Sequence, residues 1–176
     1  CGSRTCWNAR RCRWRSTTSP GFLGGKVVMV TGAGGSIGAE LGRQVARFSP
    51  SRLLLVERSE PALYTVDREL CEAWPSLSIV PMMGDVGDRE RMLAVFREHR
   101  PQVVAHAAAH KHVPLMETNA TEAVKNNVLG SQTLGEVAGE CGAESFIFIS
   151  TDKAVRPSSV MGATKRVAEL VVQGLG

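Results

Sequence analysis

The stretch that decides the fold is KVVMVTGAGGSIG, residues 26–38. Its first half, Val27 to Val30, is a short apolar and mostly β-branched run, which is typical of a strand buried on both faces of a parallel sheet. A glycine-rich turn follows, and apolar residues then recur at helical spacing over residues 37–48. This order of strand, turn and helix predicts a nucleotide-binding unit in which the helix N-terminus faces phosphate groups.

The spacing of the glycines indicates which class of nucleotide-binding turn the sequence predicts. Gly32, Gly35 and Gly38 lie at three-residue steps, whereas the sixth position of a G-x-G-x-x-G pattern is Ile37. The first glycine permits a tight turn, the second lets backbone N–H groups approach a pyrophosphate, and the third lets helix pack on strand. The spacing TGxxGxxG is that of the short-chain dehydrogenase/reductase superfamily; the alternative is an ordinary strand-to-helix turn. We expect these residues to bind a dinucleotide: Gly32, Gly34, Gly35, Ser36, Ile37 and Gly38.

The length and composition of the chain limit the number of domains and the classes of function that it can have. A chain of 176 residues suits one domain, and it lacks a run of about 18 apolar residues that would span a membrane. Residues 1–20 hold five arginines and no acid, so the net charge of +4 leaves the remaining residues at −1. We therefore expect no nucleic-acid-binding face in the body of the chain. Cys71 and Cys141 are predicted to be free thiols in a reducing, cytoplasmic compartment.

The N-terminal tail has an unusual composition. Residues 1–16, CGSRTCWNARRCRWRS, combine Cys, Trp and Arg without apolar periodicity. With a permitted choice of codons, a reading frame one base earlier gives a far more ordinary sequence. Our hypothesis is a frame error upstream of residues 16–20, so that residues 1–20 form a disordered or mistranslated tail and residues 21–176 the folded domain. A genuine basic arm and a targeting peptide are the alternatives.

The rest of the chain alternates between strand and helix patterns. Apolar runs predict strands at residues 52–56, 77–82, 102–106 and 145–149, and helical spacing predicts helices at 60–74, 88–100, 119–139 and 160–175. Residues 107–116 are expected to form a loop. The predicted fold class is α/β, a Rossmann-like doubly wound parallel sheet with strand order 3-2-1-4-5.

Residues at the ends of these strands are candidates for the rest of the dinucleotide site. Glu57 follows the second strand about 20 residues after the glycines, where a carboxylate takes both ribose hydroxyls, and this favours NAD. Arg58 could instead face the 2′-phosphate of NADP, and a surface ion pair is the third possibility. Asp85 and Val86 are expected at the adenine edge. The small side chains of Ala107, Ala108 and Ala109 suit a segment beside a cofactor.

Three histidines in or next to the loop raise the question of a metal. His106, His110 and His112 lie close together in sequence, but the carboxylates and a consistent third ligand are missing. We therefore predict that this segment binds no metal.

Several strings together identify a family. VTGAGGSIG, HAAAHKHVPLME, NNVLGS, STDKAVRP and MGATKRVAEL resemble the CapD-like polysaccharide biosynthesis family over roughly residues 25–173. Members are extended short-chain dehydrogenases that act on UDP-sugars, the UDP-N-acetylglucosamine 4,6-dehydratases. Most of the superfamily has Tyr-x-x-x-Lys, but here Met161 stands at the tyrosine position. One membrane-anchored branch of the dehydratases also carries methionine there.

The resemblance implies an internal redox reaction in which a hydride leaves sugar C4, water is eliminated across C5 and C6, and the hydride returns to C6. Carried over by position, Thr151 would bind the C4 oxygen, Asp152 would be the acid at C6 and Lys153 the base at C5. A base role for Lys153 needs a depressed pKa, which burial and Lys165 would supply. Lys165 would also hold the nicotinamide ribose. Further expected positions are Asn127 at the cofactor and Lys111 and His112 at the UDP-N-acetyl-hexosamine substrate.

By the same resemblance, the last strands and the substrate lobe are missing after Gly176. We expect a fragment that is inactive alone, from a homo-oligomeric protein attached to a membrane only through segments absent here. The alternative functions are a sugar-nucleotide epimerase or reductase of the same superfamily, and a non-catalytic dinucleotide-sensing module.

Overall fold

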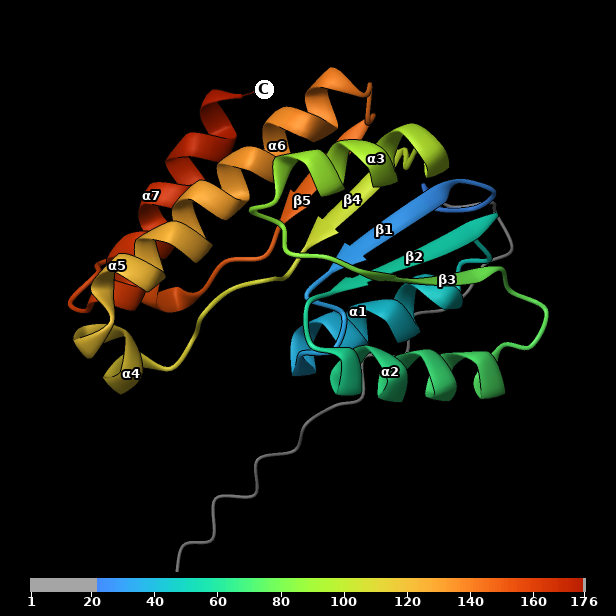
Figure 1. Cartoon of the computed structure of the whole chain (residues 1–176), viewed down its shortest axis with the longest axis horizontal. Helices are drawn as coiled ribbons and strands as arrows, with labels where there is room; N and C mark the ends of the chain where they lie inside the picture. The colour runs from blue at the N-terminus through green and yellow to red at the C-terminus, as the bar shows by residue number, and fades with distance from the viewer. Residues whose placement is uncertain (1–21, 176) are drawn as a thin grey trace, which may run out of the picture.

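The computed structural model describes residues 22–175, so the predictions for the tail of residues 1–20 lie outside it. Within the described residues, five parallel strands form one sheet, in the order β3-β2-β1-β4-β5 (Figure 1). The strands are β1 (Val27–Thr31), β2 (Arg52–Glu57), β3 (Ile79–Met83), β4 (Val103–His106) and β5 (Ser145–Phe148). The doubly wound sheet predicted from the sequence, with order 3-2-1-4-5, is therefore confirmed.

Helices cover both faces of the sheet. α1 (Ser36–Ala46) and α2 (Glu60–Ala73) lie on one face, and α3 (Arg89–His99) and α6 (Gly130–Glu140) lie on the other (Figure 1). Shorter elements connect β4 to α6, and the last helix packs beside α6 and the connecting turns. These remaining elements are α4 (Val113–Thr118), α5 (Ala120–Ala123), the π-helical turn η1 (Val124–Leu129), the 3-10 turn η2 (Asp152–Ala154) and α7 (Val160–Gly174).

The strands divide their side chains between two cores. In β1, Val28 and Val30 face the α1–α2 side with Leu53 and Leu55 of β2, and Met29 faces the α3–α6 side. All five of these side chains are fully buried. Because period-2 alternation sends apolar residues to both faces, a central parallel strand must be apolar throughout. This explains why the run after Lys26 contains no polar residue before Thr31.

Two connections differ from the sequence prediction. The predicted loop of residues 107–116 ends early, because α4 begins at Val113. A proline lies in its first turn, where it is tolerated because a backbone N–H at that position has no intrahelical partner. The helix predicted for residues 119–139 is present as α5, η1 and α6 in succession. At the end of η1 the Gly130 N–H donates to the carbonyl of Lys125, five residues back. π-Turns of this kind are frequent at functional sites.

Candidate functional site

The glycine turn after β1 is closed too tightly for larger residues. Gly32 has a left-handed φ of +66°, and a Cβ placed on it would lie 2.7 Å from the Ala108 backbone. A Cβ on Gly38 would lie 2.0 Å from the Gly32 carbonyl oxygen. α1 therefore begins directly against the turn, and no side chain caps its first N–H groups. This leaves a helix N-terminus that suits an anionic group.

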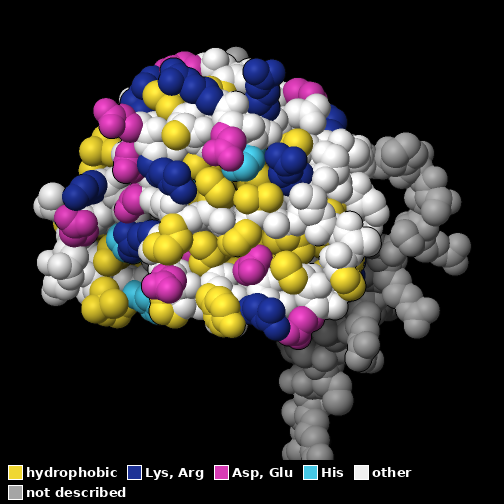
Figure 2. Space-filling view, turned by 45° about the vertical axis from the view of Figure 1, so that its right-hand side comes forward, with side chains coloured by type: hydrophobic (Ala, Val, Ile, Leu, Met, Phe, Trp, Pro, Cys, Tyr) yellow, Lys and Arg dark blue, Asp and Glu magenta, His cyan; other side chains and the backbone are white. Residues whose placement is uncertain are grey.

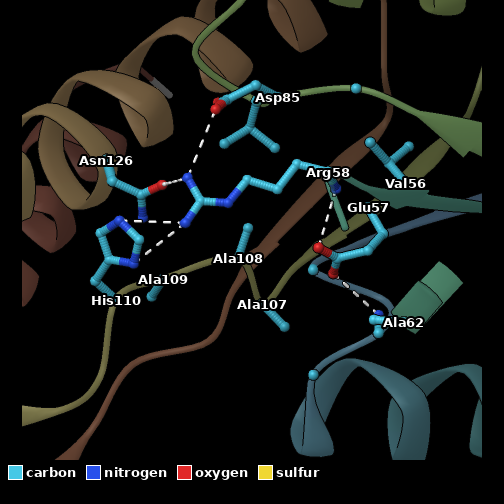
Figure 3. A pocket seen from close by; sticks show the side chains of 15 residues that line it. Val56, Glu57, Arg58, Ala62, Asp85, Ala107, Ala108, Ala109, His110 and Asn126 are labelled. Carbon is cyan, nitrogen blue, oxygen red and sulfur yellow. Dashed lines mark hydrogen bonds and ion pairs between the residues drawn. The ribbon is translucent and has the colours of Figure 1, made fainter. Parts of the chain in front are cut away.

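An open cavity of about 290 Å³ lies beyond the carboxyl ends of β1, β2 and β4 (Figure 3). The glycine turn forms one wall, and the segment after β4 forms another. The cavity lining includes ten residues predicted at the cofactor: Gly32, Gly34, Gly35, Glu57, Arg58, Asp85, Val86, Ala107, Ala108 and Ala109. Five predicted residues are not in the lining: Ser36, Ile37, Gly38, Asn127 and Lys165. The lining also includes Gly84, which the sequence places with Asp85 and Val86 at the adenine edge, and four residues that the sequence did not single out for this site: Val56, Ala62, His110 and Asn126.

Glu57 is fixed by backbone donors. Its Oε2 accepts from the Gly34 N–H at 3.1 Å, and its Oε1 accepts from the N–H groups of Arg58 and Ser59, both at 3.0 Å. A carboxylate that accepts several N–H bonds is held in one position. The side chain therefore presents a fixed negative charge at the edge of the cavity, next to the glycine turn.

Arg58 extends along the opposite side of the cavity (Figure 3). One guanidinium nitrogen lies 3.7 Å from an Asp85 carboxylate oxygen and 3.5 Å from Asn126 Oδ1, and the other lies 3.3 Å from a His110 ring nitrogen. Burial, and then the Arg58 charge, lower the pKa of His110. The neutral imidazole can therefore accept from Arg58, and the guanidinium spans from the end of β3 to the segment after β4.

Asn127 lies behind the cavity rather than in its lining. It is 1% exposed, and its amide holds the His110 backbone: Nδ2 donates to the His110 carbonyl at 3.1 Å and Oδ1 accepts from the His110 N–H at 2.8 Å. Its neighbour Asn126 lines the cavity instead. The sequence predicted Asn127 at the cofactor, whereas the structure places Asn126 in the cavity lining. Which of the two faces the cavity depends on the π-turn, which shifts the helical phase.

The predicted catalytic corner follows β5. The Thr151 hydroxyl donates to Asp152 Oδ1 at 2.9 Å, and Lys153 Nζ lies 3.4 Å from the same oxygen. These contacts, the Thr151 hydrogen bond first, lower the pKa of the Asp152 carboxyl. The Lys153 side chain is 53% exposed, so the burial that its base role requires is not found in this structure. A Cβ on Gly162 would lie 2.5 Å from the Lys153 carbonyl oxygen, so α7 packs directly against this corner.

Met161 and Lys165 share a buried face of α7, as their four-residue spacing indicates. Met161 is 4% exposed and packs in an apolar cluster with Met116 and Ala123. Lys165 is 5% exposed, its Nζ donates to the Ile149 carbonyl at 2.7 Å, and it lies over the Phe148 ring. Burial lowers the pKa of Lys165 to about 8. A lysine with this pKa exchanges protons near neutral pH.

The histidine-rich segment is divided between three environments. His106 is buried at the end of β4, His110 faces the cavity, and His112 and Lys111 are exposed just before α4. Among residues 22–175, no group of three or more His, Cys, Asp or Glu side chains is arranged to hold a metal ion.

Two general properties of residues 22–175 are the distribution of charge on their surface and the apolarity of their helices. Basic and acidic side chains are interspersed over the face in Figure 2. None of the helices in residues 22–175 combines the length and apolarity needed to cross a membrane.

Comparison with known proteins gives two informative relatives. The chain is 49% identical over 154 residues to the capsular polysaccharide biosynthesis protein CapD of Staphylococcus aureus, covering 87% of this chain and 26% of CapD. It is 33% identical over 149 residues to an inverting UDP-N-acetylglucosamine 4,6-dehydratase of Campylobacter jejuni, covering 84% of this chain and 43% of that enzyme. The chain thus spans between a quarter and a half of the length of these relatives.

Solved structures agree on the fold. Pen from Bacillus thuringiensis matches with a TM-score of 0.79 and 28% identity, over 88% of this chain and 46% of Pen. DesIV, a dTDP-glucose 4,6-dehydratase from Streptomyces venezuelae solved with NAD and TYD bound, matches with a TM-score of 0.69 and 25% identity, over 82% of this chain and 50% of DesIV. The family model described as polysaccharide biosynthesis protein matches residues 28–176. Because this match spans most of the 176 residues of the chain, the chain belongs to the polysaccharide biosynthesis protein family.

Proposed function

We propose that residues 21–176 form a domain that binds NAD in the cavity beside the glycine turn. Three features support this: the close packing at Gly32 and Gly38, the uncapped N-terminus of α1, and the alanines of the opposite wall. An adenosine would lie between Glu57 and the Asp85 segment, with its pyrophosphate at the start of α1. The structural relative DesIV was solved with NAD bound, which supports the same cofactor here.

The preference for NAD over NADP follows from the two charged side chains of the cavity. The Glu57 carboxylate is fixed by three N–H donors and would repel a 2′-phosphate, while its free lone pairs accept from ribose hydroxyls. Arg58 is directed away from Glu57, and Asp85 offsets part of its charge. In this proposal the arginine would lie beside the adenine and Glu57 would face the ribose, which favours NAD over NADP.

We propose further that the complete protein is a UDP-N-acetylglucosamine 4,6-dehydratase of surface polysaccharide or glycan synthesis. The observation that carries this is the Thr151–Asp152–Lys153 corner at the end of β5, packed against the helix of Met161 and Lys165. The Campylobacter relative carries this activity in its name. The bound nicotinamide would supply the hydride acceptor and donor, and the protein would supply the proton transfers that remove water.

The contacts at the corner suggest how substrate activates it. Thr151 has one hydroxyl proton, which it now donates to Asp152. If this hydroxyl instead binds the sugar C4 oxygen, Asp152 loses the strongest contact that lowers its pKa, and its carboxyl can hold a proton for the leaving C6 hydroxyl. That proton would come from the Lys153 ammonium, which contacts the same carboxylate oxygen, so that the neutral Lys153 amine could then accept the C5 proton. Substrate binding would thus convert an ionised carboxylate into the acid that the elimination needs.

Met161 favours this activity over an epimerase or reductase. Its thioether is buried among apolar side chains and cannot transfer a proton, so the phenolic base of the Tyr-x-x-x-Lys enzymes has no counterpart at this position. Acid–base work must come from residues at the β5 corner or from Lys165. The retention of Asp152, Lys153 and the buried Lys165 in turn argues against a non-catalytic sensing module.

The experiment is to incubate the complete protein with UDP-N-acetylglucosamine and NAD and to look for a 4-keto-6-deoxy sugar product. Asp152→Asn should abolish water elimination while the affinity for NAD is unchanged, because this side chain does not line the cavity. Normal turnover by Asp152→Asn would refute the acid assignment. Epimerised UDP-sugar as the sole product would refute the dehydratase.

The remaining expectations stay predictions from the family resemblance. They are binding of the sugar by Lys111 and His112, ribose binding by Lys165, a homo-oligomeric state and a cytoplasmic domain. The exposed position of Lys111 and His112 before α4 leaves them accessible to a substrate.

A further inference from the structure

His106 is a fully enclosed histidine with a hydrogen-bond partner on each ring nitrogen. It is 1% exposed at the end of β4, and its ring centroid lies 5.9 Å from that of Phe146 and 5.7 Å from that of Phe148. Its Nδ1 lies 2.7 Å from the Thr31 hydroxyl, and its Nε2 lies 2.9 Å from the Ser131 hydroxyl. Burying a polar group costs free energy unless its hydrogen bonds are made, and a fully hydrogen-bonded buried network fixes one geometry. The chemistry assigned to the site above does not use this residue.

The direction of these hydrogen bonds follows by elimination. The Ser131 hydroxyl donates to the Asn127 carbonyl at 2.7 Å, because a carbonyl can only accept. Its oxygen must then accept from His106, so Nε2 carries the proton. Burial, with the charge of Lys165 adding to it, lowers the pKa of His106 to about 3, so the ring is neutral and Nδ1 is bare. Thr31 therefore donates to Nδ1, and all three bonds run one way, from β1 to the π-turn.

The chain of bonds ends on the residue that joins two walls of the site. Beyond its bonds to the His110 backbone, the Asn127 side chain donates to Thr164 of α7 at 3.1 Å. The Thr164 hydroxyl in turn donates to the Met161 carbonyl at 2.8 Å. Asn127 is thus held at its carbonyl by Ser131, and through its amide it holds both the segment after β4 and the helix that carries Lys165.

We propose that His106 is a positioning residue: the one-way chain Thr31–His106–Ser131 fixes the carbonyl of Asn127 in η1 and thereby sets the segment of His110 and the start of α7 relative to the glycine turn. The effect on turnover rests on the proposed function, whereas the bond order is a property of the chain itself. Because Thr31 is the last residue of β1, the same chain ties the catalytic half of the site to the strand that begins the dinucleotide half.

The bond order is tested by ¹⁵N NMR of the imidazole in the 176-residue chain. The expected spectrum shows a bare Nδ1 and a protonated Nε2 for His106, unchanged from about pH 8 to pH 5, with Ser131→Ala used to assign the resonance. Protonation on Nδ1, or titration of the ring within this range, would overturn the proposal. This measurement needs neither substrate nor cofactor, so a failed dehydratase assay leaves its outcome intact.

The positioning role is tested with a matched pair of variants on one helix. Ser131→Ala removes the acceptor of His106 and the donor to Asn127, and Val137→Ala removes packing from the buried face of α6 outside the chain of bonds. In the complete protein we expect Ser131→Ala to lower kcat about 10- to 100-fold, since displacing a reacting group by about 1 Å costs this much. The NAD dissociation constant should rise as well, because the segment of His110 that the chain of bonds positions lines the cavity, whereas KM for the sugar should change less than about twofold, because Ser131 and His106 are not placed at the sugar.

The control separates positioning from stability. Val137→Ala should lose as much thermal stability or more, with kcat unchanged. Equal losses of kcat in the two variants, or full activity of Ser131→Ala, would contradict the positioning role. If Ser131→Ala does not fold, amide hydrogen exchange of the wild-type Asn127 side chain decides the matter: slow exchange supports the fixed geometry, and exchange as fast as that of an exposed asparagine refutes it.

Discussion

Replacing Gly38 with alanine probes the feature on which the dinucleotide site depends. The added Cβ would lie 2.0 Å from the Gly32 carbonyl oxygen, 2.6 Å from its carbon and 2.9 Å from Ala33 Cα. All three are backbone atoms that no rotamer change can move. Ordinary contact begins at 3.4 Å, so α1 and the turn must separate by about 1.4 Å. This displacement moves the helix N-terminus away from the glycine turn.

The cost can be estimated from two opposing effects. Forcing a methyl group into a packed site costs about 1–3 kcal/mol, and rigid neighbours place Gly38→Ala at the upper end. The gain in helix propensity from glycine to alanine returns up to about 1 kcal/mol. We therefore expect a net loss of about 2 kcal/mol in the free energy of unfolding, or a fall in Tm of about 4–8 °C for a chain of this size. Moving the N–H groups from the phosphates should weaken NAD binding about tenfold.

Gly139→Ala is the matched control, because Gly139 lies exposed in α6 and a Cβ added to it would meet no atom within 4 Å. The same substitution should here raise stability by about 0.5–1 kcal/mol and leave NAD affinity unchanged. Urea unfolding and isothermal titration with NAD measure both quantities. The reasoning is refuted if Gly38→Ala is as stable as the wild type and binds NAD equally well.

Two further predictions concern charged residues. Glu57→Gln should weaken NAD binding about tenfold and NADP binding much less, because it removes the negative charge held by the backbone N–H groups of residues 34, 58 and 59. Titration of the variant with both dinucleotides checks this. An unchanged ratio of NAD affinity to NADP affinity would contradict it. Burial lowers the pKa of Lys165 from 10.5 to about 8, so between these pH values the unfolded chain keeps a proton that the folded chain has lost. The free energy of unfolding should therefore rise with pH across this window. Below about pH 8 both states carry the proton, and the cost of burying the charged lysine stays constant. Lys165→Met should lack that rise in urea unfolding series at about pH 7, 9 and 10; a rise equal to that of the wild type would show that Lys165 is not its source.

The sheet could be predicted because each of its strands leaves a direct mark in the sequence. A strand buried on both faces must be apolar throughout, and the βα connections allow few parallel arrangements. The boundary at α4 was missed because residues 107–112 carry no cap that marks where a helix begins, and Pro114 suits a loop as well as a first helical turn. The π-turn was missed because no residue type marks it: it shifts the helical phase by one residue, but the sequence on each side of it still has helical spacing.

The division between prediction and structure is clearest in the site. The sequence by itself determined which segments meet, because the carboxyl ends of parallel strands lie at one edge of a sheet, and it determined the glycines, because no other residue fits their backbone. Only the tertiary structure decided which side chains of those segments face the cavity. It directed Arg58 toward Asp85, turned Asn126 into the cavity and Asn127 behind it, and left Lys153 exposed while burying Lys165. These outcomes depend on contacts between residues distant in sequence, which packing settles and local pattern does not record.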